Sequence, residues 1–284
     1  MWNISEKMKP KFYICKKVKD LENLNKPLIV VTNDDGYLAS GLKELINLVK
    51  PFGDVLVVAP EKGASGMSHA ITMSTPMRIV KAQEYENVTI YKVNGTPADC
   101  VKLALNQLTD RTPDILVSGI NHGSNSSVSV IYSGTMGGAL EGCLNGIPSI
   151  GISLDDHSSS ADFSLVSKYC EPIFKQVLEN GLPKNTALNI NFPVCSAAEF
   201  KGMKVCRQAQ GSWKEEYDKR VDPHGGTYYW LTGHFQNLDN GSEETDIWAL
   251  SNNYASIVPV NTDFTNHKVL NELSIFNKDE NGNK

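Results

Sequence analysis

The sequence predicts an α/β protein built on a doubly wound, mostly parallel β-sheet, followed by a C-terminal arm of β-hairpins and a helix. Up to residue 195, apolar runs that end in polar loops recur along the chain, as buried parallel strands do. Segments with helical spacing lie between these runs, and this alternation is typical of doubly wound sheets. Beyond residue 195 the β-like segments are separated by polar stretches, which predicts an arm.

The first β-α-β unit is predicted over residues 27–60. A buried strand begins after Pro27 and runs straight into two adjacent carboxylates and a glycine. Apolar residues at helical spacing follow up to residue 49, with Ser40 as the expected N-cap. A second apolar strand at 54–60 completes the unit.

Two strands of a subsidiary hairpin or sheet edge are expected next, at 70–80 and 88–93, after the small and polar loop 61–69. A helix is then predicted to reach residue 108, with Thr96 as its cap and Pro97 at its first position.

The second half of the core repeats the same order of elements. Strands are predicted at 113–119, 148–154 and 187–192, and a helix is predicted at 163–178. A polar loop is expected at 120–127. The Gly- and Ala-rich segment up to residue 142 predicts a helix that packs closely on its neighbours, because its residues are small.

The sequence therefore divides into an N-terminal arm (1–26), a core (27–195) and a C-terminal extension (196–284) that partly returns to the core. In the extension, β-like segments lie at 205–210, 227–231 and 254–260, and a weak terminal helix is expected at 268–276. Hairpins with little core of their own are candidates for subunit contact, and a plain structural appendage is the alternative.

The composition excludes several classes of partner. A net charge of -5 removes the positive surface expected of a protein that binds a nucleic-acid duplex or an anionic membrane. The six cysteines form no C-x-x-C pair, so neither a zinc knuckle nor a redox pair is predicted. No segment has the apolar length of a signal peptide or a membrane span, so a cytoplasmic protein with no membrane contact is expected.

Polar side chains follow three of the predicted strands. Asp34 and Asp35 follow the first strand, Ser65 and Ser68 the second, and Asn121 the third. Because a doubly wound sheet binds its ligands at the carboxyl ends of the strands, these residues are expected to converge. Carboxylate, hydroxyl and amide oxygens suit Mg²⁺, Mn²⁺ or Ca²⁺. The alternative is an ordinary helix cap and solvated loops.

A phosphate site is predicted beside this set. Ser133, Gly134 and Thr135 open a helix, and backbone amides at a helix N-terminus bind anions; a simple Ser or Thr cap is the alternative. His69 and His122 lie in the same loops and could move protons, or they could merely be solvated. The chain has neither a Walker loop nor the Asp-x-Asp pattern of aspartyl-phosphate phosphatases.

Several ordered motifs together resemble the SurE family, the stationary-phase survival proteins that act as metal-dependent nucleoside monophosphate phosphatases. The resemblance runs from about residue 28 to residue 260. In the core, its motifs are Asn33-Asp-Asp-Gly36, Val58-Ala-Pro60 with Ser65 and His69, Gly95-Thr-Pro-Ala-Asp-Cys100, Val117-Ser-Gly-Ile-Asn-His-Gly123 and Ser133-Gly-Thr135. In the arm, they are Arg207-Gln208, Trp213, Arg220, Asp222-Pro223 and Tyr228-Tyr-Trp230.

This resemblance implies a Rossmann-like core and one divalent metal ion per subunit, held by Asp34, Asp35, Ser65 and Asn121. Mg²⁺ or Mn²⁺ is expected, with Ca²⁺ as an occupant in crystals. The resemblance also implies a homodimer or homotetramer built through an exchanged C-terminal arm. Many members begin almost at the first strand, so the segment 1–26 is a departure that bears on oligomer contacts and not on the site.

The expected activity is hydrolysis of nucleoside 5′-monophosphates, and of 3′-monophosphates in addition, by direct in-line attack of water. Asp34 and Asp35 are the catalytic pair, and Asp35 is the expected proton acceptor. Ser133, Gly134, Thr135 and Asn121 are expected to bind the phosphate. The alternatives are an exopolyphosphatase or general small-phosphoester phosphatase and, in another class, a non-catalytic nucleotide or metal sensor.

Overall fold

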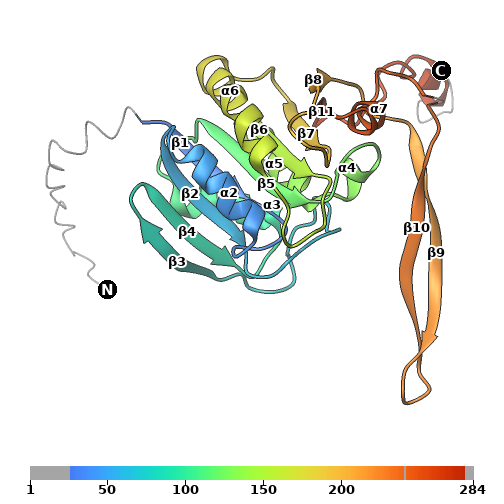
Figure 1. The fold of residues 1–284 in the computed structure, drawn as a ribbon, viewed down its shortest axis with the longest axis horizontal. Helices are drawn as coiled ribbons and strands as arrows, with labels where there is room; N and C mark the ends of the chain where they lie inside the picture. The colour runs from blue at the N-terminus through green and yellow to red at the C-terminus, as the bar shows by residue number, and fades with distance from the viewer. Residues whose placement is uncertain (1–25, 240, 279–284) are drawn as a thin grey trace, which may run out of the picture.

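The computed structural model describes residues 26–239 and 241–278, and the central feature of this part of the chain is one mixed β-sheet (Figure 1). The sheet has nine strands in the order β3-β4-β2-β1-β5-β6-β7-β11-β8. Their bounds are Leu28–Thr32 (β1), Asp54–Pro60 (β2), Ile79–Tyr85 (β3), Val88–Val93 (β4), Ile115–His122 (β5), Ser149–Leu154 (β6), Thr186–Phe192 (β7), Gly202–Val205 (β8) and Tyr254–Asn261 (β11). Only β3 against β4 and β11 against β7 are antiparallel pairs among these strands.

Helices cover both faces of the sheet. Helices α2 (Ser40–Val49) and α6 (Ser164–Asn180) contact one another on the face toward the viewer in Figure 1. Helices α3 (Pro97–Leu103) and α5 (Gly134–Leu144) pack together on the other face. The predicted doubly wound fold is confirmed.

The apolar run of β1 is continuous because both of its faces are buried. Ile29 and Val31 pack into the core cluster that contains the apolar residues of α2 and α6. Val30 points the other way and packs in the cluster with Cys100 and Val101 of α3. Chain order then reverses beside β1: the next strands in sequence lie on the β2 side, and β5, β6 and β7 lie on the other. The crevice between β1 and β5 is the switch point at which such sheets bind ligands.

Helix α5 lies unusually close to the sheet because its glycines leave room for neighbouring backbone and side chains. An added Cβ at Gly138 would meet Thr32 Cγ2 at 2.8 Å, and one at Gly142 would meet Ser149 Oγ at 2.5 Å. The close packing predicted from the small residues of this segment is therefore present, and it brings the helix N-terminus to the carboxyl ends of the strands.

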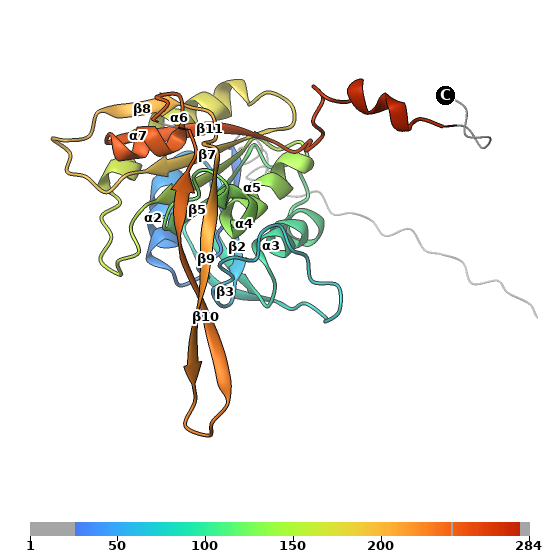
Figure 2. The ribbon, with the colours of Figure 1, turned by 90° about the vertical axis from the view of Figure 1, so that its right-hand side faces the viewer.

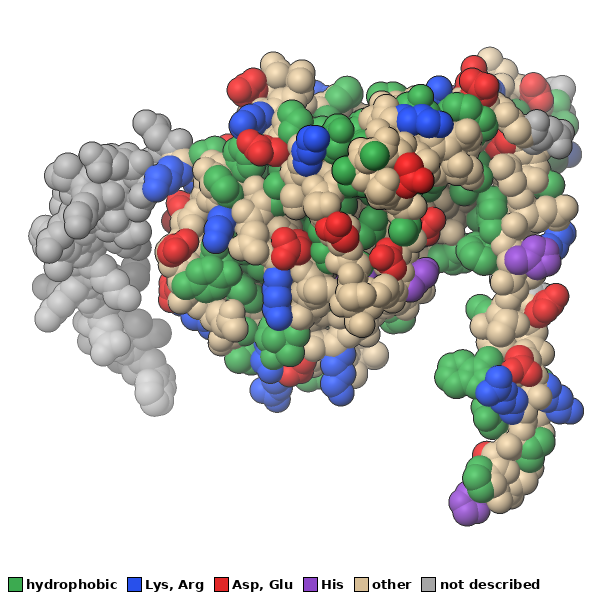
Figure 3. All heavy atoms as spheres, in the orientation of Figure 1, with side chains coloured by type: hydrophobic (Ala, Val, Ile, Leu, Met, Phe, Trp, Pro, Cys, Tyr) green, Lys and Arg blue, Asp and Glu red, His purple; other side chains and the backbone are tan. Residues whose placement is uncertain are grey.

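The C-terminal extension contributes to the sheet and also projects from it. Strands β8 and β11 join the core sheet, whereas β9 (Gly211–Val221) and β10 (Thr227–Asn237) form a separate two-stranded hairpin. This hairpin extends away from the core (Figures 1 and 2) and carries hydrophobic side chains along its length (Figure 3). A short helix, α7 (Asp246–Ser251), returns the chain to β11. No helix in 26–239 or 241–278 combines the length and the apolar character that crossing a bilayer requires.

Some predicted boundaries in the core are wrong. Ser40 is the first residue of α2 and makes no capping bond, because its hydroxyl contacts His122 Nε2 at 3.0 Å instead. Residues 70–78 form a loop, since the backbone N–H and the hydroxyl of Thr72 bond to Asp99 and hold the chain off the sheet edge; β3 starts only at Ile79. The predicted loop after residue 119 begins later, because β5 continues past a register shift to His122.

Other local predictions are confirmed or need adjusting. Thr96 caps α3 in a capping box with Asp99, and Pro97 stands at the helix start, as predicted. The helix continues as a π-turn, η1 (Ala104–Leu108). After β5, a short helix, α4 (Ser129–Tyr132), precedes α5. In the extension, β8 ends at Val205 where a strand was predicted to begin, and the terminal helix is a single 3₁₀ segment, η2 (Glu272–Phe276). Of the predicted N-terminal arm, residues 1–25 lie outside the described residues.

Candidate active site

Asp34 and Asp35 stand directly beyond β1, in a turn closed by local bonds. The Asn33 side chain donates to Gly36 O at 3.0 Å, and Gly36 adopts a positive φ of 101° that favours glycine. This turn places the two carboxylates at the switch point between β1 and β5.

Asp34 is the more buried acid, with 3% of its surface exposed. Thr135 Oγ1 donates a hydrogen bond to Asp34 Oδ1 at 2.6 Å. Burial raises the pKa of Asp34 to about 6, and the Asp35 charge adds to the rise, while the bonds from Thr135 oppose it. In the protein without a cation, Asp34 is therefore half-protonated near pH 6.

Asp35 is partly exposed and is oriented by β5. Its Oδ2 accepts a bond from the His122 backbone N–H at 3.3 Å. Burial raises the pKa of Asp35, and the His122 bond and the nearby His122 and His157 rings work against that rise. Neither aspartate forms an ion pair with Lys or Arg within the described ranges. Two adjacent carboxylates with no cationic side chain are a natural position for a divalent ion.

Three of the four predicted metal ligands line a single cavity of about 480 Å³ at the switch point, named here the acidic cavity. They are Asp34, Ser65 and Asn121. The Ser65 loop is held there because Ala64 N donates to Asp34 O at 2.7 Å. The Asn121 amide nitrogen bonds to Gly123 O at 2.7 Å, so Oδ1 is the atom that Asn121 can offer to a metal. Asp35 is next to this group in the chain but is absent from the described lining.

The predicted phosphate residues divide into two groups. Ser133 lines the acidic cavity and accepts the Met136 backbone N–H at 3.0 Å, as an N-cap of α5. Gly134 and Thr135 instead contact Asp34: a Cβ at Gly134 would lie 2.8 Å from Asp34 Cβ. The sequence did not reveal that these two residues hold the acid in place.

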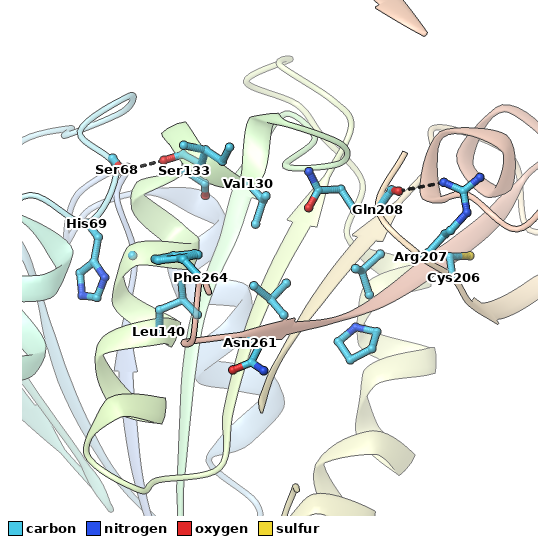
Figure 4. A pocket seen from close by; sticks show the side chains of 15 residues that line it. Ser68, His69, Val130, Ser133, Leu140, Cys206, Arg207, Gln208, Asn261 and Phe264 are labelled. Carbon is cyan, nitrogen blue, oxygen red and sulfur yellow. Dashed lines mark hydrogen bonds between the residues drawn. The ribbon is translucent and has the colours of Figure 1, made fainter. Parts of the chain in front are cut away.

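The two loop histidines lie in different places. His122 lines the acidic cavity. His69 lines a second, larger cavity of about 680 Å³, named here the apolar cavity (Figure 4). There His69 Nε2 lies 3.0 Å from Glu141 Oε2, and Glu141 also accepts a bond from Lys102. Burial raises the pKa of Glu141, but the bonds from His69 and Lys102 outweigh it and the net pKa is lowered. Ser68, in the same loop, is committed to a bond with Ile131 O.

The loop after β5 is fixed by a buried polar network. Asn125 N donates to Asn191 Oδ1 at 2.7 Å, and Asn125 Nδ2 donates to Ser153 Oγ at 2.8 Å. Asp246 of α7 accepts the Ser127 backbone N–H at 2.7 Å and the Ala209 backbone N–H at 2.9 Å. The loop that follows Asn121 and His122 is therefore joined by buried hydrogen bonds to the C-terminal extension.

Most of the chain is similar in sequence to proteins of one known family. Residues 29–215, more than half of the chain, match the family model described as survival protein SurE. The chain belongs to the SurE family. Proteins named 5′-nucleotidase SurE are similar over nearly their whole length: that of Christiangramia forsetii is 51% identical over 89% of this chain and 97% of its own, and that of Cytophaga hutchinsonii is 49% identical over 88% and 97%.

A solved SurE structure has the same fold. The crystal structure of the SurE protein from Aquifex aeolicus is 38% identical, with a TM-score of 0.75, and the match covers 87% of this chain and 98% of that one. The sequence resemblance to SurE is thereby confirmed.

In this SurE chain the acidic cavity also has a wall that the sequence did not predict. Trp213, Leu231, Thr232 and Gly233 of the β9–β10 hairpin line it opposite the strand ends. Trp213 was visible only as one of the arm motifs, and nothing in its local sequence assigns it to the site. Its position depends on the direction in which the hairpin leaves the core after Ala209.

Proposed function

We propose that this protein is a metal-dependent 5′-nucleotidase that hydrolyses nucleoside 5′-monophosphates to nucleoside and phosphate, with 3′-monophosphates as further substrates. The main support is the acidic cavity at the switch point: Asp34 lines it, Asp35 is next in the chain, and Ser133 at the N-terminus of α5 belongs to the same lining. Neither carboxylate has a Lys or Arg partner in the described chain. The relatives named 5′-nucleotidase SurE align with 88% and 89% of this chain and share about half of the aligned residues.

The proposed metal ligands are Asp34, Asp35, Ser65 and Asn121. No group of three or more His, Cys, Asp or Glu side chains with metal-binding geometry occurs in the described parts of the chain, so two carboxylates, a hydroxyl and an amide oxygen are the donors on offer. Such donors fit one Mg²⁺ or Mn²⁺ per subunit, with Ca²⁺ a further candidate. When bound, this cation would neutralise phosphate charge and acidify a water molecule.

The chain's own groups account for the remaining steps of the proposal. The N-terminus of α5, with Ser133, Gly134 and Thr135, orients the phosphoryl oxygens together with Asn121. Asp35 is partly exposed and has a raised pKa, so its carboxylate is suited to accept the proton of the attacking water. Attack in line breaks the phosphorus–oxygen ester bond, and His122, which lines the cavity, is the candidate proton donor to the leaving oxygen. Trapping a stable phospho-aspartate would contradict this direct path.

The exposed hairpin supports a further part of the proposal, a homodimer or homotetramer assembled through the C-terminal arm. A two-stranded hairpin is marginally stable alone, and near its tip Val221 and Tyr229 are more than half exposed, at 62% and 58%. The five cysteines in the described chain are all free, which suits the reducing cytoplasm proposed for this enzyme.

A phosphate-release screen across 5′- and 3′-nucleotides and short polyphosphates, with Mg²⁺, Mn²⁺ or Ca²⁺, tests the function. Nucleoside monophosphates are expected to be the best substrates. We expect Asp35→Asn to lower turnover by about 10²- to 10⁴-fold, the usual contribution of general acid–base catalysis. Asp110→Asn, an exposed carboxylate before β5 at the other end of the sheet, is the control. Faster release from polyphosphate would select the exopolyphosphatase, and nucleotide binding without release would select the sensor.

A further inference from the structure

The wall that the hairpin adds to the acidic cavity differs in chemistry from the rest of the lining. On the strand side the cavity presents Asp34, Asn121 and Ser133, which suit a phosphate and a metal. On the hairpin side it presents Trp213, Leu231 and Gly233. A cavity that is polar at one end and aromatic at the other matches the two ends of a nucleotide.

Hydrogen bonds at the base of the hairpin, where its strands leave the core, hold it beside the acidic cavity. Asp246 accepts the Ala209 N–H at 2.9 Å, and the Ser127 hydroxyl donates to Ala209 O at 2.8 Å. Leu238 N donates to Gln210 O at 2.9 Å and closes the two strands where they leave the core. Trp213 lies only three residues beyond Gln210, so these buried bonds fix it close to the cavity.

One face of the hairpin supplies Trp213, Leu231 and Gly233, and only Thr232 of this wall comes from the opposite face. Trp213 pairs directly with Phe235, and Leu231 pairs with Tyr217, so all four side chains share a face because alternate residues of a strand point the same way. Gly233 lies on this face between the two pairs, which stand about 13 Å apart along the strands. Gly233 itself places no side chain on this face between Trp213 and Leu231.

Trp213 is also available for stacking. Its ring meets Phe235 edge to face, with centroids 5.9 Å apart and an interplanar angle of 69°, and this contact orients the indole. The side chain remains 43% exposed. We propose that Trp213, with Leu231 across the gap at Gly233, binds the nucleobase of the substrate by stacking. This inference rests on the proposed 5′-nucleotidase function and names the part of the site that distinguishes a nucleotide from a base-free phosphomonoester.

A stacking wall has a consequence for specificity. Every base has a π-face, so stacking on an aromatic side chain discriminates weakly between bases. The wall is therefore expected to favour nucleotides over sugar phosphates while accepting both purines and pyrimidines.

The test compares AMP with ribose 5-phosphate, which has the same sugar and phosphoester but no base. In the full-length, metal-loaded protein we expect Trp213→Ala to lower the ratio of kcat/KM for AMP to kcat/KM for ribose 5-phosphate by roughly 5- to 150-fold, mainly through the KM for AMP. Trp213→Phe should keep most of that ratio. Trp230→Ala is the matched control, because Trp230 is an exposed tryptophan on the opposite face of the same hairpin, paired with Asp218.

The outcomes separate this inference from the proposed function. If wild-type protein releases phosphate from neither substrate, the proposed function fails and the inference fails with it. If wild-type protein hydrolyses AMP but Trp213→Ala leaves the ratio unchanged, or lowers both efficiencies equally, the stacking wall is overturned while the function stands. If Trp230→Ala lowers the ratio as much as Trp213→Ala does, the stacking wall is also overturned.

Discussion

The two cavities that share Ser133 differ in size and in chemistry, and the smaller one is the better candidate for catalysis. The apolar cavity is larger, at about 680 Å³ against about 480 Å³, and is lined by residues such as Val130, Leu140 and Val258. His69, in its lining, is hydrogen-bonded to Glu141. The acidic cavity instead collects the ends of three parallel strands. Its position at the strand ends, and not its volume, is what makes the acidic cavity the candidate.

The largest expected effect separates the two cavities directly. Asp34→Asn in the acidic cavity should lower AMP hydrolysis by at least about 10²-fold, because it removes a charge that would face the metal and phosphate. Asn261→Ala in the lining of the apolar cavity should leave turnover within about twofold, since surface changes away from a site are usually small. Phosphate release under saturating AMP checks both. If the two variants lose turnover equally, the acidic cavity is no better a candidate for catalysis than the apolar cavity.

A smaller effect sharpens the role of α5. Gly134→Ala would place a Cβ 2.8 Å from Asp34 Cβ and 2.9 Å from Asp34 Oδ2, so the acid must move. We expect turnover to fall by about 10²-fold, the cost of displacing a catalytic group by roughly 1 Å. Gly63→Ala is the matched control, because its Cβ would meet only Asp35 O at 3.7 Å and Asp34 O at 3.9 Å. If the two variants behave alike, Gly134 has no special role in holding Asp34.

The smallest effect concerns stability and pH. Because the folded pKa of Asp34 is about 6 and its ordinary value is 3.8, the cation-free protein binds this proton more tightly when folded. Its contribution to stability is full below pH 3.8 and is lost as the pH rises through 6, a loss on the order of 3 kcal/mol at 1.36 kcal/mol per pKa unit. Thermal unfolding of wild type and Asp34→Asn from about pH 3.5 to pH 7.5 should show this loss only in wild type, with most of it between pH 3.8 and pH 6.

Added Mg²⁺ or Mn²⁺ should reverse that loss, because a ligand that binds only the folded state stabilises it. The rise in Tm should therefore be larger at pH 7.5 than at pH 5, and absent in Asp34→Asn. A rise that is independent of pH would place the bound metal away from Asp34.

The parts that the sequence predicted are those determined by neighbouring residues. The buried strands, the Thr96 capping box and the positions of Asp34 and Asn121 at strand ends follow from short patterns and from the fold class. Ser40 shows the limit of such patterns: it looks like a cap, but its hydroxyl contacts His122, which is 82 residues away in the chain.

The parts that the sequence missed depend on distant contacts. Strand β9 is polar and charged, so nothing in its own pattern predicts a strand, and it forms because it pairs with β10 over its whole length. Trp213 enters the acidic cavity only through that hairpin. The part of Gly134 and Thr135 in holding Asp34 likewise becomes visible only when α5 lies against β1. Which residues hold the metal and the phosphate stays a prediction.

The carboxylate of Asp246 joins two segments that would otherwise fluctuate separately. It accepts one N–H from Ser127, in the loop that follows β5, and one from Ala209, at the base of the hairpin. Order in either segment therefore favours order in the other, and by thermodynamic reciprocity the influence is equal in both directions. Anything that immobilises the hairpin, including contact with a second subunit, would lower the entropy that the site loses when it binds a nucleotide. Assembly and substrate affinity would then rise together.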